Sequence, residues 1–255
     1  MCLILLAVDV HERYRWVIAG NRDEYYERPT RAADFWPSGE DIFAGRDERA
    51  GGTWMGVSSK GRFATLTNYR DLSLLKTDAP SRGVLVKDFL LSKEKPAQYF
   101  DRLAKKSNHY SGFSMIAGAN SSLGYYSNVE NRVRLIERGV FGLSNNLFDV
   151  PWPKVETGKR RLTALLDKQE DDLVHGLLEV LQDSTKPPDD KLPDTGVGLD
   201  WERTLSSIFI RSPGYGTRAS SVVLFSRTGE VTFVEQTYKD GKESDAARWF
   251  RFSLD

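Results

Sequence analysis

The chain has one cysteine, Cys2, which directly follows Met1. Removal of Met1 would give Cys2 a free α-amine beside its thiol. The ordinary pKa of an α-amine is about 7.7–8.0 and that of a thiol about 8.5, so near neutral pH the amine can act as base for the thiol. Nucleophiles activated by their own terminal amine are known in covalent catalysis. The alternative is a small apolar residue at the start of a buried strand, because free cysteine is commonly buried and inert.

Four polar clusters interrupt the hydrophobic pattern, and each is predicted to lie at the end of a strand. They are Asn21-Arg22-Asp23-Glu24, Asn68-Tyr69-Arg70, Ser144-Asn145-Asn146 and Tyr215-Gly216-Thr217-Arg218. The first cluster follows a strand that is predicted to pair with the strand after Cys2 in an antiparallel hairpin. We therefore expect Cys2 to lie near Asn21–Asp23.

The chemistry of these clusters suits acyl transfer. We expect Asp23 to hold the α-amine of Cys2, Asn145 to donate to a developing oxyanion, and Arg218 to bind Asp23 or a substrate carboxylate. Arg22 and Asp23 would point to opposite faces of a continuing strand, and we expect Asp23 to face Cys2.

Other polar residues of the clusters are candidates for binding a ligand. These candidates are Asn21, Arg22, Asn68, Tyr69 and Tyr215. The alternative is that Asn, Asp and Gly simply build turns there, and we favour that role for Asn68 and Asn146. For Asp23 and Arg218 we favour function, because a charged group near the core is costly unless it is paired.

Composition excludes several classes of protein. Lys plus Arg and Asp plus Glu each number 36, so the net charge is zero and neither a nucleic-acid partner nor an anionic membrane surface is indicated. One cysteine excludes an internal disulfide and a structural cysteine–zinc site, and His11, His109 and His175 have no metal-ligand spacing. The apolar run Leu3–Val8 is too short to be a signal peptide or a membrane span. We expect a cytoplasmic protein with a small-molecule or lipid-like ligand, no cofactor requirement and no metal, and we leave its oligomeric state open.

Hydrophobic periodicity predicts the elements that position the clusters. Strands are expected at Leu3–Val8, Arg15–Ala19, Thr53–Ser58, Arg62–Thr67, Phe113–Gly118, Gly124–Ser127, Val133–Ile136, Val140–Leu143, Ser207–Ile210, Ala219–Ser226, Val231–Gln236 and Trp249–Ser253. Helices are expected at Gly83–Leu91, Ala97–Lys105, Lys154–Leu166 and Asp172–Gln182. Residues 21–50 are predicted to form a long functional loop, and residues 184–200 an exposed loop. This order favours an α+β fold, with two sheets covered by helices in a single domain 1–255, over an alternating parallel α/β fold.

Six motifs carry a resemblance to a known family. They are Met1-Cys2, Asn21-Arg22-Asp23-Glu24, Gly51-Gly52-Thr53-Trp54-Met55-Gly56, Leu66-Thr67-Asn68-Tyr69, Gly142-Leu143-Ser144-Asn145 and Pro213-Gly214-Tyr215-Gly216-Thr217-Arg218. In this order, and over nearly the whole chain, they resemble the NRDE family, whose animal members are called transport and Golgi organisation protein 2. That family is similar in turn to N-terminal-nucleophile hydrolases of the bile-salt hydrolase and penicillin V acylase kind.

The resemblance implies a four-layer αββα fold and a set of site residues. Cys2 matches the nucleophile, Asp23 the aspartate after the second strand, Asn145 the oxyanion asparagine, and Arg218 the late active-site arginine. Those hydrolases carry an arginine three residues before the aspartate, where this chain has Gly20, so Arg22 is displaced from the matching position.

Two functions follow from the resemblance. The first is hydrolysis of a non-peptide C–N amide bond by Cys2 after removal of Met1. The second is non-enzymatic, because members of the family are implicated in intracellular haem trafficking and in lipid or acyl-CoA homeostasis. A protein of that second kind would bind haem or an acyl lipid as a transported ligand, in an apolar cleft with Cys2 or a histidine as a weak axial ligand.

Overall fold

The computed structural model describes residues 3–37 and 39–254. Its backbone contacts divide the chain into two compact units. The first unit contains the chain through Glu27, Arg138–Ser144 and Phe148–Arg251, and the second contains Arg28–Glu137, Asn145–Leu147 and the residues from Phe252 onward. Each unit therefore combines segments that are far apart in the sequence.

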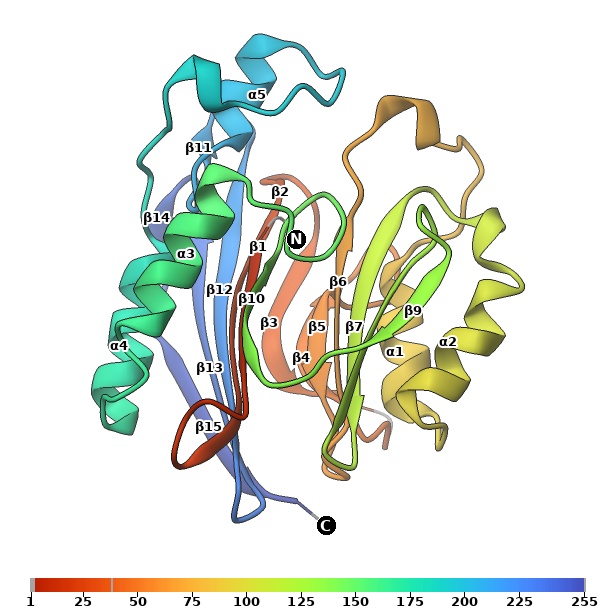
Figure 1. Cartoon of the computed structure of the whole chain (residues 1–255), viewed down its shortest axis with the longest axis vertical. Helices are drawn as coiled ribbons and strands as arrows, with labels where there is room; N and C mark the ends of the chain where they lie inside the picture. The colour runs from red at the N-terminus through yellow and green to blue at the C-terminus, as the bar shows by residue number, and fades with distance from the viewer. Residues whose placement is uncertain (1–2, 38, 255) are drawn as a thin grey trace. The chain divides into compact units, whose positions relative to one another are not determined.

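The first unit is built on an antiparallel sheet with the strand order β10-β1-β2-β12-β13-β14, in which β11 also pairs with β12 and β15 with β13. The strands are β1 (Leu3–Val8), β2 (Tyr14–Tyr25), β10 (Gly139–Leu143), β11 (Arg211–Ser212), β12 (Tyr215–Ser226), β13 (Glu230–Lys239), β14 (Lys242–Glu243) and β15 (Arg248–Ser253). Helix α3 (Pro153–Thr163) packs on β1 and β10, and α4 (Glu170–Leu181) packs on β2 and β12, so this pair covers one face of the sheet (Figure 1). The 3-10 helix η3 (Asp189–Lys191) and helix α5 (Leu199–Leu205) precede β11.

An apolar stripe holds α4 on this sheet. Leu173, Leu177 and Leu181 recur every fourth residue along α4 and are completely buried in the core of the first unit. This spacing places them on one face of the helix. Burial of each leucine side chain contributes about 1.5–3 kcal/mol, which explains why a short helix is stable at this position.

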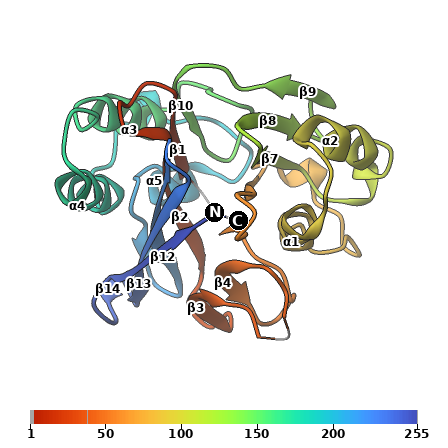
Figure 2. The ribbon, with the colours of Figure 1, turned by 90° about the horizontal axis from the view of Figure 1, so that it is seen from below.

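The second unit is built on an antiparallel sheet with the strand order β3-β4-β5-β6-β7-β8-β9. The strands are β3 (Thr30–Phe35), β4 (Phe43–Asp47), β5 (Met55–Val57), β6 (Phe63–Asn68), β7 (Phe113–Ala119), β8 (Ser122–Ser127) and β9 (Arg132–Leu135). Helix α1 (Gly83–Leu91) packs on β5 and β6, and α2 (Pro96–Ala104) packs on β7, β8 and β9 (Figure 2). Two 3-10 helices, η1 (Leu72–Leu74) and η2 (Ser107–His109), complete the unit.

The structure confirms the predicted α+β class with two antiparallel sheets, each covered by a helix pair. Four predictions about elements were wrong. The Tyr215–Arg218 cluster does not precede the strand predicted at Ala219–Ser226 but belongs to it, since β12 begins at Tyr215. The Asn21–Glu24 cluster does not follow β2 but lies inside it, residues 30–35 and 43–47 form β3 and β4 and not a loop, and Ser207–Ile210 is not a strand. Among the helices of the part that the structure describes, none is long and apolar enough to cross a membrane.

Candidate functional site

The Asn21–Asp23 segment lies between two neighbouring strands. Leu3, the first residue of β1, pairs with Asn21 on one side of β2. On the other side, Ser220 of β12 pairs with Asn21, and Thr217 pairs with Asp23. Cys2 lies outside the described residues, so its predicted place near this segment stays a prediction.

Asn21 is completely buried, and its side chain has a partner for each polar atom. Its Nδ2 donates to the carbonyl of Leu181 at 2.8 Å and to that of Ile208 at 2.9 Å. Its Oδ1 accepts from the hydroxyl of Ser220 at 2.7 Å. Asn21 therefore joins β2 to the end of α4 and to the segment before β11.

Asp23 is also buried, with 4% of its surface exposed, but its carboxylate is only half satisfied. The Thr217 hydroxyl donates to Oδ1 of Asp23 at 2.6 Å. The same hydroxyl accepts from the backbone N–H of Ile210 at 2.9 Å, which leaves its proton for Asp23. Oδ2 of Asp23 is buried and has no hydrogen-bond partner within residues 3–37 and 39–254.

Arg218 occupies a bulge of β12. The pairing of β12 with β2 shifts between Thr217 and Ala219, so Arg218 is an extra residue on β12. Such a bulge redirects a side chain that regular pairing would point elsewhere. Nη1 of Arg218 donates to the carbonyls of Tyr25 at 2.9 Å and Tyr26 at 3.0 Å, so the guanidinium supports the turn that follows β2.

Two further predicted residues lie beside this group. Arg22 is buried, and its Nη2 lies 3.9 Å from the Glu24 carboxylate. Tyr215 is partly buried and makes an edge-to-face contact with the exposed Tyr25, with ring centroids 5.2 Å apart. A pair of this kind presents an aromatic surface next to the polar segment.

A second group of predicted residues belongs to the second unit. Nδ2 of Asn145 donates to the carbonyl of Asn68, at the end of β6, at 3.0 Å. The backbone N–H of Arg70 donates to the carbonyl of Asn145 at 2.8 Å, and Nη2 of Arg70 lies 3.3 Å from Oδ1 of Asn145. Burial raises the pKa of the neighbouring Tyr69, so its hydroxyl stays protonated. Asn145 is thus held in one orientation by the carbonyl of Asn68 and by Arg70.

Thr217 and Tyr26 are two further residues of this segment, and the sequence motifs alone predicted no role for them. The Tyr26 hydroxyl is buried, has no hydrogen-bond partner among the described residues and has a pKa raised by burial. It lies against Gly216, where a Cβ atom would be 2.2 Å from it. Thr217 lies inside the Pro213–Arg218 motif, and Tyr26 lies two residues after the Asn21–Glu24 motif. These positions are the sequence signal that could have identified both residues. No group of three potential metal ligands occurs among the described residues.

Nearly the whole sequence is similar to a known protein family. The profile described as "Transport and Golgi organisation 2" matches residues 1–240. The chain belongs to this family. A Transport and Golgi organization protein 2 homolog from Bos taurus is 36% identical over 273 residues, with 98% of this chain and 96% of the relative covered. The predicted family is therefore confirmed, and it includes both units of the chain.

The chain of this Transport and Golgi organisation 2 family member has a fold that is also found in solved structures. A Caenorhabditis elegans N-acylethanolamine-hydrolyzing acid amidase ortholog superposes with a TM-score of 0.52 at 13% identity, over 88% of this chain and 92% of that one. A mutant conjugated bile acid hydrolase from Clostridium perfringens superposes with a TM-score of 0.51 at 10% identity, over 100% of this chain and 92% of that one. The chain has the fold of these N-terminal-nucleophile hydrolases, as predicted.

Proposed function

We propose that this chain is a cysteine amidohydrolase that cleaves the C–N bond of a non-peptide amide, such as an acylated amine. Cys2 is the nucleophile after Met1 is removed, and its α-amine is the base. The fold shared with amide-cleaving hydrolases supports the proposal. A small-molecule or lipid-like acyl substrate and a cytoplasmic location belong to the proposal as well.

The observation that carries the proposal is the half-satisfied carboxylate of Asp23. Leaving a buried polar atom without a hydrogen bond costs about 1–3 kcal/mol, and more when the group is charged. The α-amine of Cys2 is a donor of the type that Oδ2 lacks. Leu3, the residue after Cys2, pairs with Asn21, two residues before Asp23 on β2.

The reaction would proceed in two steps. The Cys2 thiol transfers its proton to the α-amine and attacks the carbonyl carbon, and the oxyanion that forms accepts hydrogen bonds from N–H donors, which is the role that the sequence predicts for the Asn145 amide. Collapse of this intermediate breaks the C–N bond, the amine product leaves with the proton from the α-ammonium, and a thioester remains on Cys2. Water, deprotonated by the α-amine, then attacks the thioester and releases the carboxylic acid.

The proposal is tested by the mass of the native protein and by turnover. We expect native protein to lack Met1 and to release amine from a panel of N-acylated amines, and we expect Cys2→Ala to abolish this release. Cys2 is the only cysteine, so iodoacetamide labelling reports on this residue alone. Retention of Met1 in the native host would rule out the mechanism.

The same preparation distinguishes the non-enzymatic alternative. Haem titration, followed through the Soret band, measures binding without turnover. Saturable haem binding that Cys2→Ala leaves unchanged, with no amine released from any substrate, would replace the amidohydrolase proposal by a binding function. Haem binding no tighter than that of an unrelated protein would reject the haem form of the alternative.

A further inference from the structure

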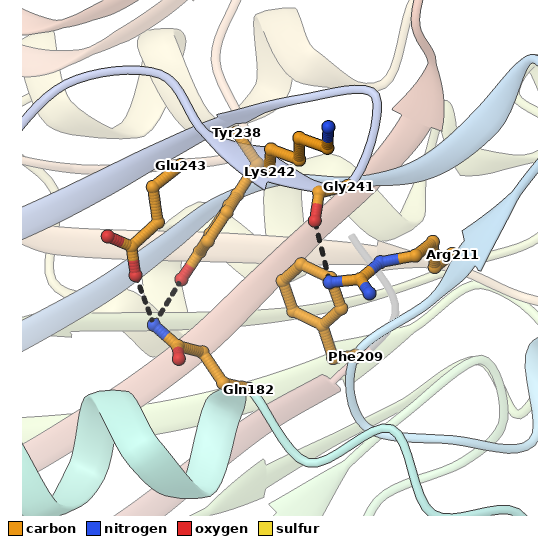
Figure 3. A pocket seen from close by; sticks show the side chains of 7 residues that line it. All are labelled: Gln182, Phe209, Arg211, Tyr238, Gly241, Lys242 and Glu243. Carbon is orange, nitrogen blue, oxygen red and sulfur yellow. Dashed lines mark hydrogen bonds between the residues drawn. The ribbon is translucent and has the colours of Figure 1, made fainter.

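A pocket of about 390 Å³ lies in the first unit, beside the hairpin formed by β13 and β14 (Figure 3). Its volume is within the range of small-molecule sites, about 300–1,000 Å³. None of the residues assigned to the amidohydrolase site lines this pocket. Its lining instead comes from the end of α4, the segment that enters β11, and the hairpin.

The guanidinium of Arg211 is fixed in this pocket by the hairpin turn. Asp240 and Gly241 both have positive φ, 51° and 72°, as a two-residue type I′ turn requires. Nη2 of Arg211 donates to the carbonyl of Gly241 at 2.7 Å. A Cβ atom at Gly241 would lie 2.6 Å from Nε of Arg211, so only glycine lets the arginine lie flat on this turn. Within the described residues this is the hydrogen bond its guanidinium makes, and further N–H groups are available to a ligand.

The charge around the pocket is unbalanced toward cations. In the part of the chain that the structure describes, neither Arg211 nor Lys242 forms an ion pair, although Asp240 lies in the same turn. The single lining carboxylate, Glu243, accepts from Nε2 of Gln182 at 3.0 Å. The lining residues thus include two cations and one carboxylate, and that carboxylate already accepts a hydrogen bond.

The pocket also offers an aromatic surface. Phe209 and Tyr238 line it and pack edge to face, with ring centroids 4.8 Å apart. The Arg211 guanidinium lies 5.6 Å from the centre of the Phe209 ring. Nε2 of Gln182 donates to the Tyr238 hydroxyl at 3.1 Å, which holds this ring in place (Figure 3). Both side chains are buried, at 3% and 4% exposed, so they form the floor of the pocket and a ligand would contact only a small part of either ring.

We propose that this pocket binds a small organic anion. Its carboxylate or phosphate group pairs with Arg211, as planar guanidinium groups do with such oxyanions, and Lys242 adds a second positive charge. Its apolar part packs against Phe209 and Tyr238. This site does not depend on Cys2, so it stands or falls separately from the amidohydrolase proposal.

Calorimetric titration of the full chain tests the site with three probes: phenyl phosphate, benzoate and the neutral benzyl alcohol. We expect saturable binding of one or both anions and none of benzyl alcohol. Arg211→Gln should weaken anion binding about tenfold, the typical effect of removing a charge-assisted hydrogen bond. Glu243→Gln keeps an acceptor for Gln182 and removes the competing charge, so it should tighten binding, a gain that misfolding cannot produce.

The matched control is Lys168→Gln. Lys168 is exposed in the same unit and precedes α4, whose 12 residues, about 18 Å long, separate it from Gln182. This variant removes the same charge as Arg211→Gln and should leave the affinity unchanged. Equal affinity for benzyl alcohol, equal loss in Lys168→Gln, or no saturable binding of either anion would overturn the proposal. Cys2→Ala should bind as the unsubstituted chain does.

Discussion

Two neighbouring buried polar residues on the same face of β2 differ in how completely their side chains are hydrogen bonded. Every polar atom of the Asn21 amide has a partner, whereas Asp23 keeps one carboxylate oxygen without a partner among the described residues. Buried polar groups are nearly always satisfied, so the exception marks a position where another group is required. This contrast gives Asn21 a structural role in the fold and supports the chemical role proposed for Asp23.

Replacing Asp23 by asparagine tests that role. Asp23→Asn keeps an oxygen for Thr217 and removes the negative charge that we expect to hold the α-amine of Cys2. We predict that kcat/KM for amide hydrolysis falls by about 10²–10⁴-fold, the usual contribution of general acid–base catalysis. Steady-state kinetics on the most active N-acylated amine of the panel measures this loss.

The control for that variant is Glu235→Gln. Glu235 is a carboxylate of β13 in the same sheet, only 2% exposed, and no catalytic role is assigned to it. The unfolding free energy of Glu235→Gln shows the effect of neutralising a buried acid as such, and its kcat/KM should stay within about threefold of the original. Equal kinetic losses in the two variants would assign the Asp23 effect to structure and contradict the predicted role.

At the scale of elements, the local hydrophobic pattern predicted most strands and helices, and long-range pairing decided the rest. Leu3–Val8 and Gly83–Leu91 have the predicted bounds. The strand predicted to end at Ala19 continues to Tyr25, because β12 pairs with it along its whole length, through Tyr215 opposite Tyr25. Asn, Arg, Asp and Glu are typical of a strand end when only local sequence is considered.

The site could be predicted by its residue types but not by its bonds. The motifs identified Asp23 and Arg218, yet the bulge that redirects Arg218 toward the Tyr25 and Tyr26 carbonyls depends on a register between strands nearly two hundred residues apart. The role of Thr217 depends on the same register. Such pairings follow from the folded sheet and leave no periodic signal in a single sequence.

The turn between β1 and β2 contains a titratable hydrogen-bond acceptor. Nδ1 of His11, which is 6% exposed, accepts from the backbone N–H groups of Arg13 at 3.0 Å and Tyr14 at 3.2 Å. Burial lowers the pKa of His11 below its ordinary value of 6.5, against the smaller opposite effect of the Lys168 carbonyl. Protonation of Nδ1 would also remove the acceptor that both backbone groups need.

This turn should make stability depend on pH. Between pH 6.5 and the lowered pKa of folded His11, the unfolded chain binds a proton that the folded chain does not. The stability contribution is therefore complete above pH 6.5 and decreases as the pH falls through that window. His11→Asn retains a side-chain oxygen as acceptor and cannot titrate, so its unfolding free energy should fall less on acidification.

Urea unfolding of both proteins at a series of pH values between about 7.5 and 5 measures the difference. The exposed His109, replaced in the same way, serves as the control for the loss of a histidine side chain at the surface. If the His11→Asn and original curves remained parallel across this range, the turn would have no role in the pH dependence.

At the scale of the whole molecule, neither unit is one continuous segment of the chain, and the family match does not separate the two units. The chain passes from one unit to the other after Glu27, Glu137, Ser144, Leu147 and Arg251. The family match over residues 1–240 contains all the segments up to β13 and spans both sheets. A family defined over both units is consistent with the predicted single domain 1–255, which stays a prediction.

Unfolding tests this last prediction. Because neither unit is a single continuous segment, we expect the chain to unfold in one transition, with equal calorimetric and van't Hoff enthalpies. Leu177→Ala in the core of the first unit and Phe89→Ala in the core of the second should each lower stability by about 2–5 kcal/mol, since each leaves a cavity. Each variant should shift the whole transition, whether it is followed by calorimetry, circular dichroism or tryptophan fluorescence.

Leu135→Ala is the control, because Leu135 is 65% exposed and its truncation removes little buried surface. Two resolved transitions, with Leu177→Ala moving one and Phe89→Ala the other, would show instead that the chain holds two independently folding domains.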